Sequence, residues 1–186
     1  MAGALLAVLV ARVSILPFLL PALTYDHLLK MRTRIDADGV CLQGTDYTCG
    51  PAAAVTALRQ LGVEAEEGRL AVLAHSSWAA GTPTECLCRA VEEACGVRCR
   101  IIHGDSPAEL RGQEPLVAII RFGVLVDHFV AVLEVQPDSV VVGDPLNGKC
   151  RLSLEEFRRK WRKTAIRFDP VARAGGEKSL RNPGES

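Results

Sequence analysis

The stretch QGTDYTCGPAAAVTALRQLG, residues 43–62, places a cysteine at the start of an alanine-rich run. The run predicts a helix that begins at Cys49, because Gly50 and Pro51 suit a first turn and Gly62 suits a C-terminal stop. A thiol in the first turn lies beside free backbone N–H groups and the positive end of the helix dipole, which favour a thiolate. Taken alone, a cysteine here is also a common small core residue.

A nucleophilic cysteine needs a base, and the base needs a group that orients it. Among the four histidines, His128 opens the apolar strand pattern HFVAVLEV, in the part of the chain that must pack on the first helix. Asp144 ends the next predicted strand, and a hairpin brings the start of one strand beside the end of its partner. The neighbouring Asp127 would point the other way. The sequence therefore predicts that His128 pairs with Asp144.

Gln43 precedes the thiol by six residues, enough for a tight loop that returns its amide beside the sulfur. With the backbone N–H of Cys49, that amide is expected to bind a developing oxyanion. Each residue also has an ordinary structural explanation on its own, but the combination is much less expected by chance. The candidate catalytic set is Cys49, His128, Asp144 and Gln43.

Helical patterns come first along the chain, and strand patterns follow. Predicted helices cover residues 66–76 and residues 81–96, the second capped by Thr82 or Thr84, before a short capped turn at residues 106–112. Predicted strands cover residues 115–122, 127–135, 139–145 and 164–168, with an Asn-Gly turn at residues 146–149 and a helix over residues 153–161 before the last strand. This order predicts an α+β fold rather than alternating βαβ units.

The motifs QGTDYTCGPAAAVTALRQLG, DHFVAVLEVQPDSVVVGDPLNG and LSLEEFRRKW, in this order and spacing, resemble the bacteriocin-processing, double-glycine-leader peptidase family of papain-like cysteine peptidases. The resemblance covers about residues 40–168. It implies a papain-like fold, with an N-terminal helical half packed on an antiparallel sheet. It also implies Cys49 as nucleophile and His128 as general base and acid. Asp144 would orient the imidazole and Gln43 would donate to the oxyanion, with no cofactor and no metal.

In that family the domain typically forms the N-terminal part of peptide-exporting ABC transporters, and it also occurs in shorter membrane-associated proteins. The resemblance therefore implies a cysteine endopeptidase that cuts a peptide leader after small residues of the Gly-Gly type, with such a transporter as a candidate partner. Two alternatives stay open: a papain-like transpeptidase or amidotransferase, and a non-catalytic module that holds a leader peptide for a transporter. An intact Cys49 argues against the second. The chain has no Walker-type loop, so ATP-driven export is not expected as its own activity.

Charge and cysteine content narrow the options further. The chain has 22 basic and 22 acidic residues and no basic block, so nucleic acid is not an expected partner. Its 7 cysteines are odd in number and lack the spacing of a small secreted scaffold, which favours free thiols in a reducing compartment. Zinc or a disulfide stays an alternative for Cys86, Cys88, Cys95 and Cys99. Against zinc, Cys86 and Cys88 project about 200° apart on a helix, and Cys88 and Cys95 share a face, which suits a core.

The N-terminal residues 2–23 are apolar except at two positions, one of them Arg12, and about 20 apolar residues can span a bilayer. Arg12 and two prolines weaken a spanning helix. A signal peptide would lack its basic region and its cleavage site here, and a packed core helix is the third interpretation. As an anchor, the segment followed by Lys30, Arg32 and Arg34 predicts a cytoplasmic peptidase domain by the positive-inside rule. As a signal, it predicts export to the periplasm or cell surface.

Three parts of the chain follow from these patterns. Residues 1–35 would form the hydrophobic segment and a basic linker, and residues 36–170 the peptidase domain. The polar, glycine-containing residues 171–186 are expected to form a disordered tail.

Overall fold

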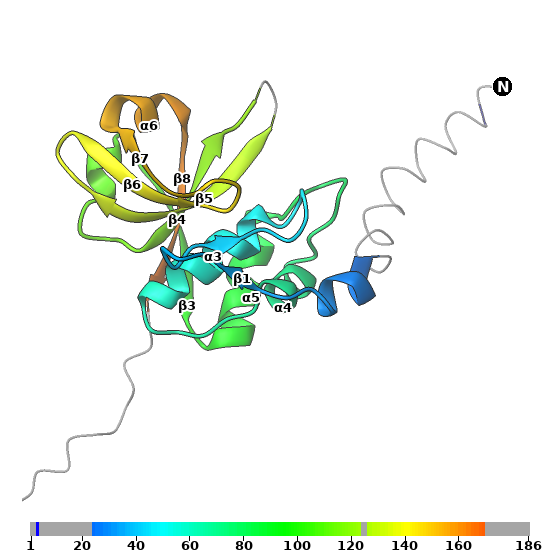
Figure 1. Ribbon diagram of the computed structural model, residues 1–186. Helices are drawn as coiled ribbons and strands as arrows, with labels where there is room; N and C mark the ends of the chain where they lie inside the picture. Colours follow the sequence, from blue (N-terminus) through cyan, green and yellow to red (C-terminus); the bar gives the residue numbers. More distant parts are fainter. Residues whose placement is uncertain (1–2, 4–23, 124–125, 170–186) are drawn as a thin grey trace, which may run out of the picture.

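The computed structural model describes residue 3, residues 24–123 and residues 126–169 of the 186-residue chain. Helices come first and an antiparallel sheet follows, which confirms the predicted α+β order (Figure 1). The helices are α3 (Cys49–Gln60), α4 (Glu67–Leu73), α5 (Thr84–Cys95), the 3-10 helix η2 (Pro107–Leu110) and α6 (Leu154–Lys160). The strands are β1 (Arg34–Ile35), β2 (Cys41–Leu42), β3 (Arg98–His103), β4 (Leu116–Arg121), β5 (Asp127–Val135), β6 (Ser139–Asp144), β7 (Gly148–Ser153) and β8 (Trp161–Asp169).

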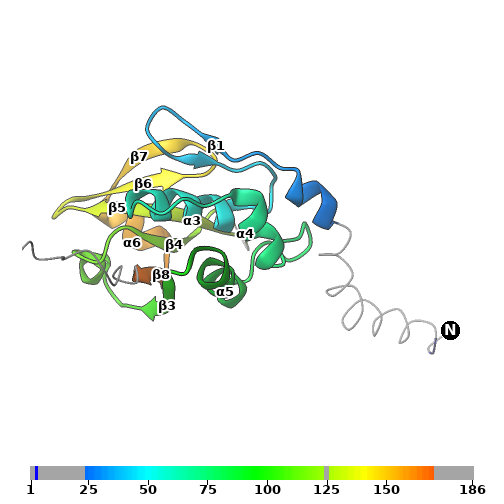
Figure 2. The same ribbon diagram turned by 90° about the horizontal axis from the view of Figure 1, so that it is seen from below.

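Six strands form one antiparallel sheet in the order β3-β8-β4-β5-β6-β7, while β1 and β2 pair separately. Helices α3, α4 and α5 lie on one side of this sheet and α6 lies on the other, as Figures 1 and 2 show from two directions. Successive residues of a strand point to opposite faces. Val117 therefore packs in the core that contains α3 and α5, whereas Leu116 packs with Phe157 of α6. Burial on both faces explains why β4 and β5 are continuously apolar in sequence.

Helix α3 is buried along nearly its whole length, from Cys49 to Leu58. Small side chains let it approach the sheet closely. A methyl group on Gly143 of β6 would lie only 2.9 Å from Cγ2 of Thr56. The Thr56 hydroxyl in turn accepts a hydrogen bond from the backbone N–H of Cys41 at 2.9 Å. These contacts hold α3 against β2 and against the strand that ends in Asp144.

Several local predictions need correction. Helix α5 starts after Pro83 without a side-chain cap, so neither predicted threonine caps it. The Thr82 hydroxyl instead donates to the carbonyl oxygen of Tyr47 at 3.2 Å and shares a 2.8 Å hydrogen bond with Ser76. Residues 148–153 form the edge strand β7, which the sequence did not predict because its half-exposed side chains carry little apolar signal. The last helix ends at Lys160, and Trp161 begins β8.

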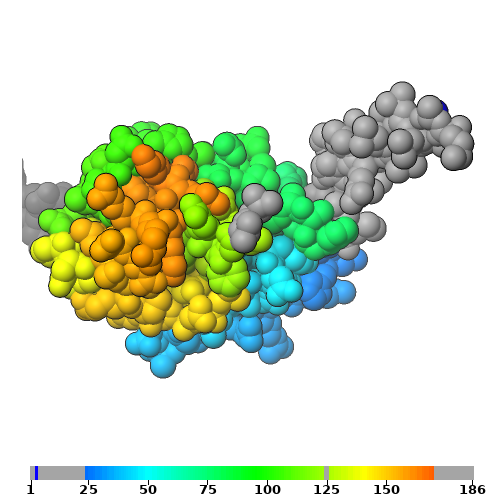
Figure 3. Space-filling view, turned by 90° about the horizontal axis from the view of Figure 1, so that it is seen from above, coloured from blue at the N-terminus to red at the C-terminus, as the bar shows by residue number. Residues whose placement is uncertain are grey.

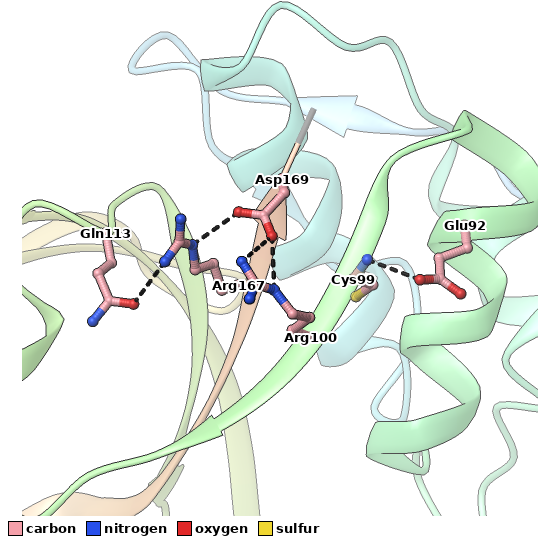
Figure 4. A network of polar contacts seen from close by, with 6 residues as sticks. All are labelled: Glu92, Cys99, Arg100, Gln113, Arg167 and Asp169. Carbon is pink, nitrogen blue, oxygen red and sulfur yellow. Dashed lines mark hydrogen bonds and ion pairs between the residues drawn. The ribbon is translucent and has the colours of Figure 1, made fainter. Parts of the chain in front are cut away.

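Charged side chains join the strands at the β3 edge of the sheet (Figure 4). Asp169 of β8 accepts from Nε of Arg100 at 2.8 Å and pairs with Nε of Arg167 at 2.9 Å. Nearby, Glu92 of α5 accepts a hydrogen bond from the backbone N–H of Cys99 at 2.9 Å. Because these groups are accessible to water, the ion pairs stabilise this edge only weakly.

The first well-described segment packs against α4. Residues 24–29 are helical and Leu28 is buried. A methyl group on Gly68 would lie 2.2 Å from the carbonyl oxygen of Leu28, so only glycine permits this approach. Within the described ranges, no helix is both long and apolar enough to cross a bilayer.

Two predictions concern segments that the structure hardly describes. Residues 2–23, the candidate anchor, lie outside the described residues apart from residue 3, and so does the predicted tail at residues 171–186. The boundary drawn at residue 35 stays a prediction.

Candidate active site

The start of α3, the start of β5 and the end of β6 bring a thiol, an imidazole and a carboxylate together. Nε2 of His128 lies 2.7 Å from Oδ1 of Asp144. The side chain of Cys49 lies close enough to raise the pKa of the imidazole, and Nδ1 is the ring nitrogen left to face the thiol. The three residues are only 9%, 4% and 8% exposed, in the order Cys49, His128, Asp144. The imidazole is therefore held between the thiol and the carboxylate, largely out of water.

Strand register explains how two residues 16 positions apart meet. Ala131 of β5 lies opposite Gly143 of β6, and extending this register puts residue 130 opposite Asp144. His128 then occupies the next position on the same face. Such diagonal neighbours are about 7–8 Å apart at their Cα atoms, within reach of long side chains.

Burial and hydrogen bonding act in opposite directions on both titratable partners. Burial lowers the pKa of His128, but the hydrogen bonds and negative charges of Asp144 and Cys49 together raise it to about 9. Burial raises the pKa of Asp144, but hydrogen bonds from His128, Leu146 and Asn147 hold it below its ordinary value. Both shifts favour an imidazolium beside a carboxylate.

The carboxylate of Asp144 is fully occupied. Its Oδ1 accepts the backbone N–H of Leu146 at 2.9 Å in addition to His128, and its Oδ2 accepts the side-chain amide of Asn147 at 2.8 Å. Sequence reasoning missed Asn147 as a site residue. The only signal was its position in the Asn-Gly turn directly after β6.

An aromatic side chain covers the imidazole. The ring of Phe122 lies 5.3 Å from that of His128, centroid to centroid, at an interplanar angle of 46°. Phe122 itself is 59% exposed, at the end of β4. Figure 3 shows the face on which the β4–β5 hairpin, in yellow-green, lies between the residues of α6 and β8 in orange and the helical half in cyan and teal.

Gln43 begins a loop that folds back on itself before Cys49. Its side-chain Nε2 donates to the carbonyl oxygen of Thr45 at 2.8 Å, which uses one of the two amide hydrogens. The Thr48 hydroxyl donates to the same carbonyl at 3.2 Å. Oε1 of Gln43 is buried and has no hydrogen-bond partner in the described part of the chain. The amide thus retains one N–H for a further acceptor.

A hollow adjoins this loop. It has a volume of about 470 Å³ and is lined by residues 44–47 and by Trp78, whose side chain is 65% exposed. The short segment that carries Trp78 is closed by paired backbone hydrogen bonds of 2.9 and 2.8 Å between Ser77 and Gly81. The hollow therefore borders the loop that leads into α3.

The remaining cysteines are not part of the candidate catalytic set. All 7 are free, and Cys88 and Cys95 contribute to the same core cluster, as their shared helix face predicts. Within the described ranges, no cluster of three or more His, Cys, Asp or Glu side chains is arranged to hold a metal ion. The chemistry available at the site is that of a thiol, an imidazole, a carboxylate and amide donors.

Comparison with solved structures shows the same fold in peptidase domains. A double-glycine motif protease from an AMS/PCAT transporter, in complex with the leader peptide, matches with a TM-score of 0.63 and 20% identity, over 76% of this chain and 96% of that one. The peptidase domain of Streptococcus ComA, a bifunctional ABC transporter involved in a quorum sensing pathway, matches with a TM-score of 0.62 and 23% identity, over 70% and 96%. A putative C39-like peptidase from Bacillus anthracis matches with a TM-score of 0.60 and 16% identity, over 76% and 99%. The papain-like peptidase fold expected from the sequence is confirmed.

Sequence comparison agrees with these folds. An uncharacterised protein of Methanothermobacter marburgensis is 30% identical over 136 residues, which cover 72% of this chain and 89% of the relative. A second, from Methanothermobacter thermautotrophicus, is 28% identical over 129 residues, covering 69% and 87%. The sequence profile of the Peptidase C39 family matches residues 38–173, nearly all of the described domain. The chain therefore belongs to the Peptidase C39 family.

Proposed function

We propose that this protein is a cysteine endopeptidase that cuts a peptide leader after small residues of the Gly-Gly type. The single observation that carries the proposal is the imidazole of His128, which is hydrogen-bonded to Asp144 at 2.7 Å and has the Cys49 side chain as its other titratable neighbour. A thiol, a base and an orienting carboxylate in this order are the parts that nucleophilic acyl transfer needs. Membership in a peptidase family supports the same chemistry.

In the proposed reaction, the Cys49 sulfur attacks the scissile carbonyl carbon as the thiolate, its proton residing on His128. The carbonyl oxygen becomes an oxyanion, which the free N–H of Gln43 and the backbone N–H of Cys49 stabilise. The imidazolium of His128 then gives its proton to the departing amine nitrogen, and the C–N bond breaks to leave a thioester. His128 next takes a proton from water, whose oxygen attacks the thioester carbon. The C–S bond then breaks, the leader leaves as a carboxylic acid, and the Cys49 thiolate with its proton on His128 is restored.

Asp144 acts on this cycle through His128. Its carboxylate holds the ring by Nε2, so that Nδ1 faces the thiol, and it stabilises the positive charge that the ring carries before the amine leaves. Asn147 and the N–H of Leu146 fix the carboxylate in turn. Each step therefore depends on the end of β6 keeping its position beside the start of β5.

Limited access to the sulfur supports small residues at the cleavage site. Cys49 is only 9% exposed, so a peptide must lie extended and close to the start of α3 to present its carbonyl. Side chains larger than hydrogen on the residues next to the scissile bond would separate the carbonyl from the sulfur. The hollow lined by residues 44–47 and Trp78 offers room for upstream leader residues. The leader peptide bound by the similar transporter protease supports a peptide ligand.

The same proposal includes a cellular setting. Similar folds are peptidase domains of ABC transporters, which supports a peptide-exporting transporter as partner. The apolar residues 2–23, followed by Lys30, Arg32 and Arg34, support attachment to a membrane with the peptidase domain on the cytoplasmic side. Nucleic acid is not part of the proposal, because basic and acidic residues are equal in number at 22 each.

Direct cleavage tests the proposal. The purified chain is incubated with a synthetic leader peptide that contains an internal Gly-Gly, and the products are weighed by mass spectrometry. We expect a single cut after the second glycine, no cut by Cys49→Ala, and no cut after Gly-Gly is replaced by Val-Val. Addition of a primary amine tests the alternative of amide transfer: a product mass that carries the amine in place of water would show a transferase. Intact peptide in every sample would refute the proposed function.

A further inference from the structure

A buried acidic side chain outside the candidate catalytic set contacts the loop before Cys49. Glu67, the first residue of α4, has an exposed fraction of 0%. Its Oε1 accepts a hydrogen bond from the backbone N–H of Gly44 at 2.7 Å. Its own backbone N–H donates to the hydroxyl of Thr33 at 2.9 Å. A carboxyl group taken fully out of water is destabilising unless its partners compensate, so this position needs an explanation.

A cation contacts the other end of the same peptide unit. Nη2 of Arg34, on β1, donates to the carbonyl oxygen of Gln43 at 2.9 Å. That carbonyl and the N–H of Gly44 belong to one planar peptide group. The Gln43–Gly44 peptide unit is therefore bound at its oxygen by a guanidinium and at its nitrogen by a carboxyl group. The backbone N–H of Gln43 also donates to the carbonyl oxygen of Pro145 at 3.0 Å, next to Asp144.

We propose that Glu67 and Arg34 are positioning residues, which fix the Gln43–Gly44 peptide unit and thereby aim the Gln43 amide at the substrate oxyanion. The inference rests on the proposed function, because it takes Gln43 as the oxyanion donor. A displacement of the peptide unit moves the Cα atom of Gln43, to which the side chain is attached. A misplacement of about 1 Å in a catalytic group can cost on the order of 10²-fold in rate. The two residues would then affect turnover without touching the substrate.

The incomplete satisfaction of Glu67 fits this role better than a purely structural one. Its Oε2 is buried and has no hydrogen-bond partner among the residues that the structure describes, since the nearby Thr48 hydroxyl donates to the carbonyl oxygen of Thr45 instead. Burial raises the pKa of Glu67, while the N–H of Gly44, the hydroxyl of Thr48 and the charge of Arg34 act to lower it. A half-satisfied carboxyl group is a poor way to stabilise a core. Retaining it is reasonable where its other oxygen holds a loop that the chemistry needs.

The test compares substitutions that remove these contacts with substitutions at neighbouring charges. Glu67→Leu removes the acceptor for Gly44, and Glu66→Leu is the matched control, since Glu66 is exposed and makes no side-chain cap hydrogen bond. Arg34→Gln weakens the contact with the carbonyl oxygen of Gln43. Its matched control is Arg32→Gln, because Arg32 is also exposed. Turnover of the Gly-Gly peptide and alkylation of Cys49 by iodoacetamide are measured for each. Alkylation forms no oxyanion, so it reports the thiol independently of Gln43.

We expect Glu67→Leu to lower kcat roughly 10- to 100-fold with KM and the alkylation rate changed less than about twofold. Glu67→Gln, which keeps an acceptor for Gly44, should restore kcat to within about threefold of wild type. Arg34→Gln should lower kcat severalfold, and both control substitutions should leave it unchanged. In a Gln43→Ala background, Glu67→Leu should lower kcat little further, because the group that it positions is gone.

The inference is overturned if Glu67→Leu lowers kcat equally with and without Gln43, slows alkylation as much as turnover, or changes nothing. If Glu67→Leu fails to fold, by circular dichroism, the exposed Arg34→Gln decides the matter: unchanged kcat in that variant overturns the inference. If the wild type cuts the peptide but the variants do not show the expected changes in kcat, the inference alone is refuted. A wild type that cuts no peptide refutes the proposed function, and the inference with it.

Discussion

Nε2 of His128 and Oδ1 of Asp144 are 2.7 Å apart although the residues are separated by 16 positions in the chain. Both side chains are almost fully buried, at 4% and 8% exposure. An imidazole paired with a carboxylate in such surroundings keeps its proton to higher pH, because loss of the proton would leave the carboxylate charge unpaired. The pair therefore sets the pH range in which the site is expected to be active. It also makes His128 the expected proton carrier and Asp144 the group that orients it.

Substitutions of Cys49, His128 and Asp144 should reduce peptide cleavage to different extents. Cys49→Ala and His128→Ala are each expected to abolish cleavage of a Gly-Gly leader peptide, because nucleophile and base act as a unit. Asp144→Asn should retain some activity, since an amide can still hold the ring although it stabilises the imidazolium less. Steady-state kinetics with one peptide and all three variants checks this order. Residual cleavage by Cys49→Ala would exclude the cysteine mechanism.

Gln43→Ala should lower kcat by roughly 10²- to 10³-fold with little change in KM, because an oxyanion donor acts on charge that exists only near the transition state. The measurement is a full set of initial rates against peptide concentration. Gln60→Ala, at the exposed end of α3, serves as the matched control. A raised KM at unchanged kcat would instead make Gln43 a ground-state contact.

Activity should fall as pH rises through about 9, where the imidazole of His128 loses its proton. Asp144→Asn should move this alkaline limb to lower pH, because the carboxylate charge that helps to raise the pKa of His128 is lost. If the alkaline limb lies at the same pH in wild type and in Asp144→Asn, a group other than His128 causes it. The profile of kcat/KM from pH 5 to pH 10.5 provides the comparison.

Stability should follow the same titration. The pKa of His128 is raised from its ordinary 6.5 to about 9, so its contribution to the free energy of unfolding is complete below about pH 6.5 and is lost as pH rises through about 9. Asp144, whose pKa is lowered from 3.8, contributes above that value and loses its contribution as pH falls below it. Thermal melts at pH 6 and pH 10 should show a larger decrease for wild type than for His128→Ala. Equal decreases would contradict this account.

Cys49 should be the cysteine that iodoacetamide alkylates first at about pH 6, because it alone adjoins both a helix start and an imidazolium. Burial raises the pKa of Cys41 to about 12 and also raises that of Cys150. Cys88 is the informative competitor, since the hydrogen bond from Cys99 lowers its pKa although its side chain is buried. Peptide mapping after short labelling identifies the site. Labelling of Cys88 at the rate of Cys49 would remove the special status of Cys49.

Deletion of residues 1–23 should leave a folded domain with its thiol reactivity intact, because the described packing begins with residues 24–29 against α4. Deletion of residues 1–31 is the harsher comparison: it removes the buried Leu28 and should lower the melting temperature. Circular dichroism melts and the alkylation rate of Cys49 are compared for both. Aggregation of the shorter deletion would place residues 1–23 in the core.

Local patterns in the sequence were sufficient for the order of elements and for the pairing of His128 with Asp144. The alanine-rich run after Cys49 is bounded by residues that are typical of helix ends. The strands around His128 and Asp144 are apolar, β-branched runs that end in turn residues. A hairpin places the ends of neighbouring strands side by side whatever the rest of the fold does. These predictions depended on contacts between segments that are close in sequence. A single sequence was therefore enough to make them.

Contacts made by distant segments were decided by the tertiary structure alone. Glu67 has the sequence pattern of a solvated acid at a helix start, yet α4 buries it against Gly44, 23 residues earlier. Thr82 has the pattern of a helix cap, yet its hydroxyl binds the carbonyl oxygen of Tyr47, 35 residues earlier. A polar side chain is equally compatible with water and with a buried partner, and its own sequence neighbours do not distinguish the two. Only the packing of α3, α4 and the loop before Cys49 excludes the water and leaves the backbone groups as the partners that remain.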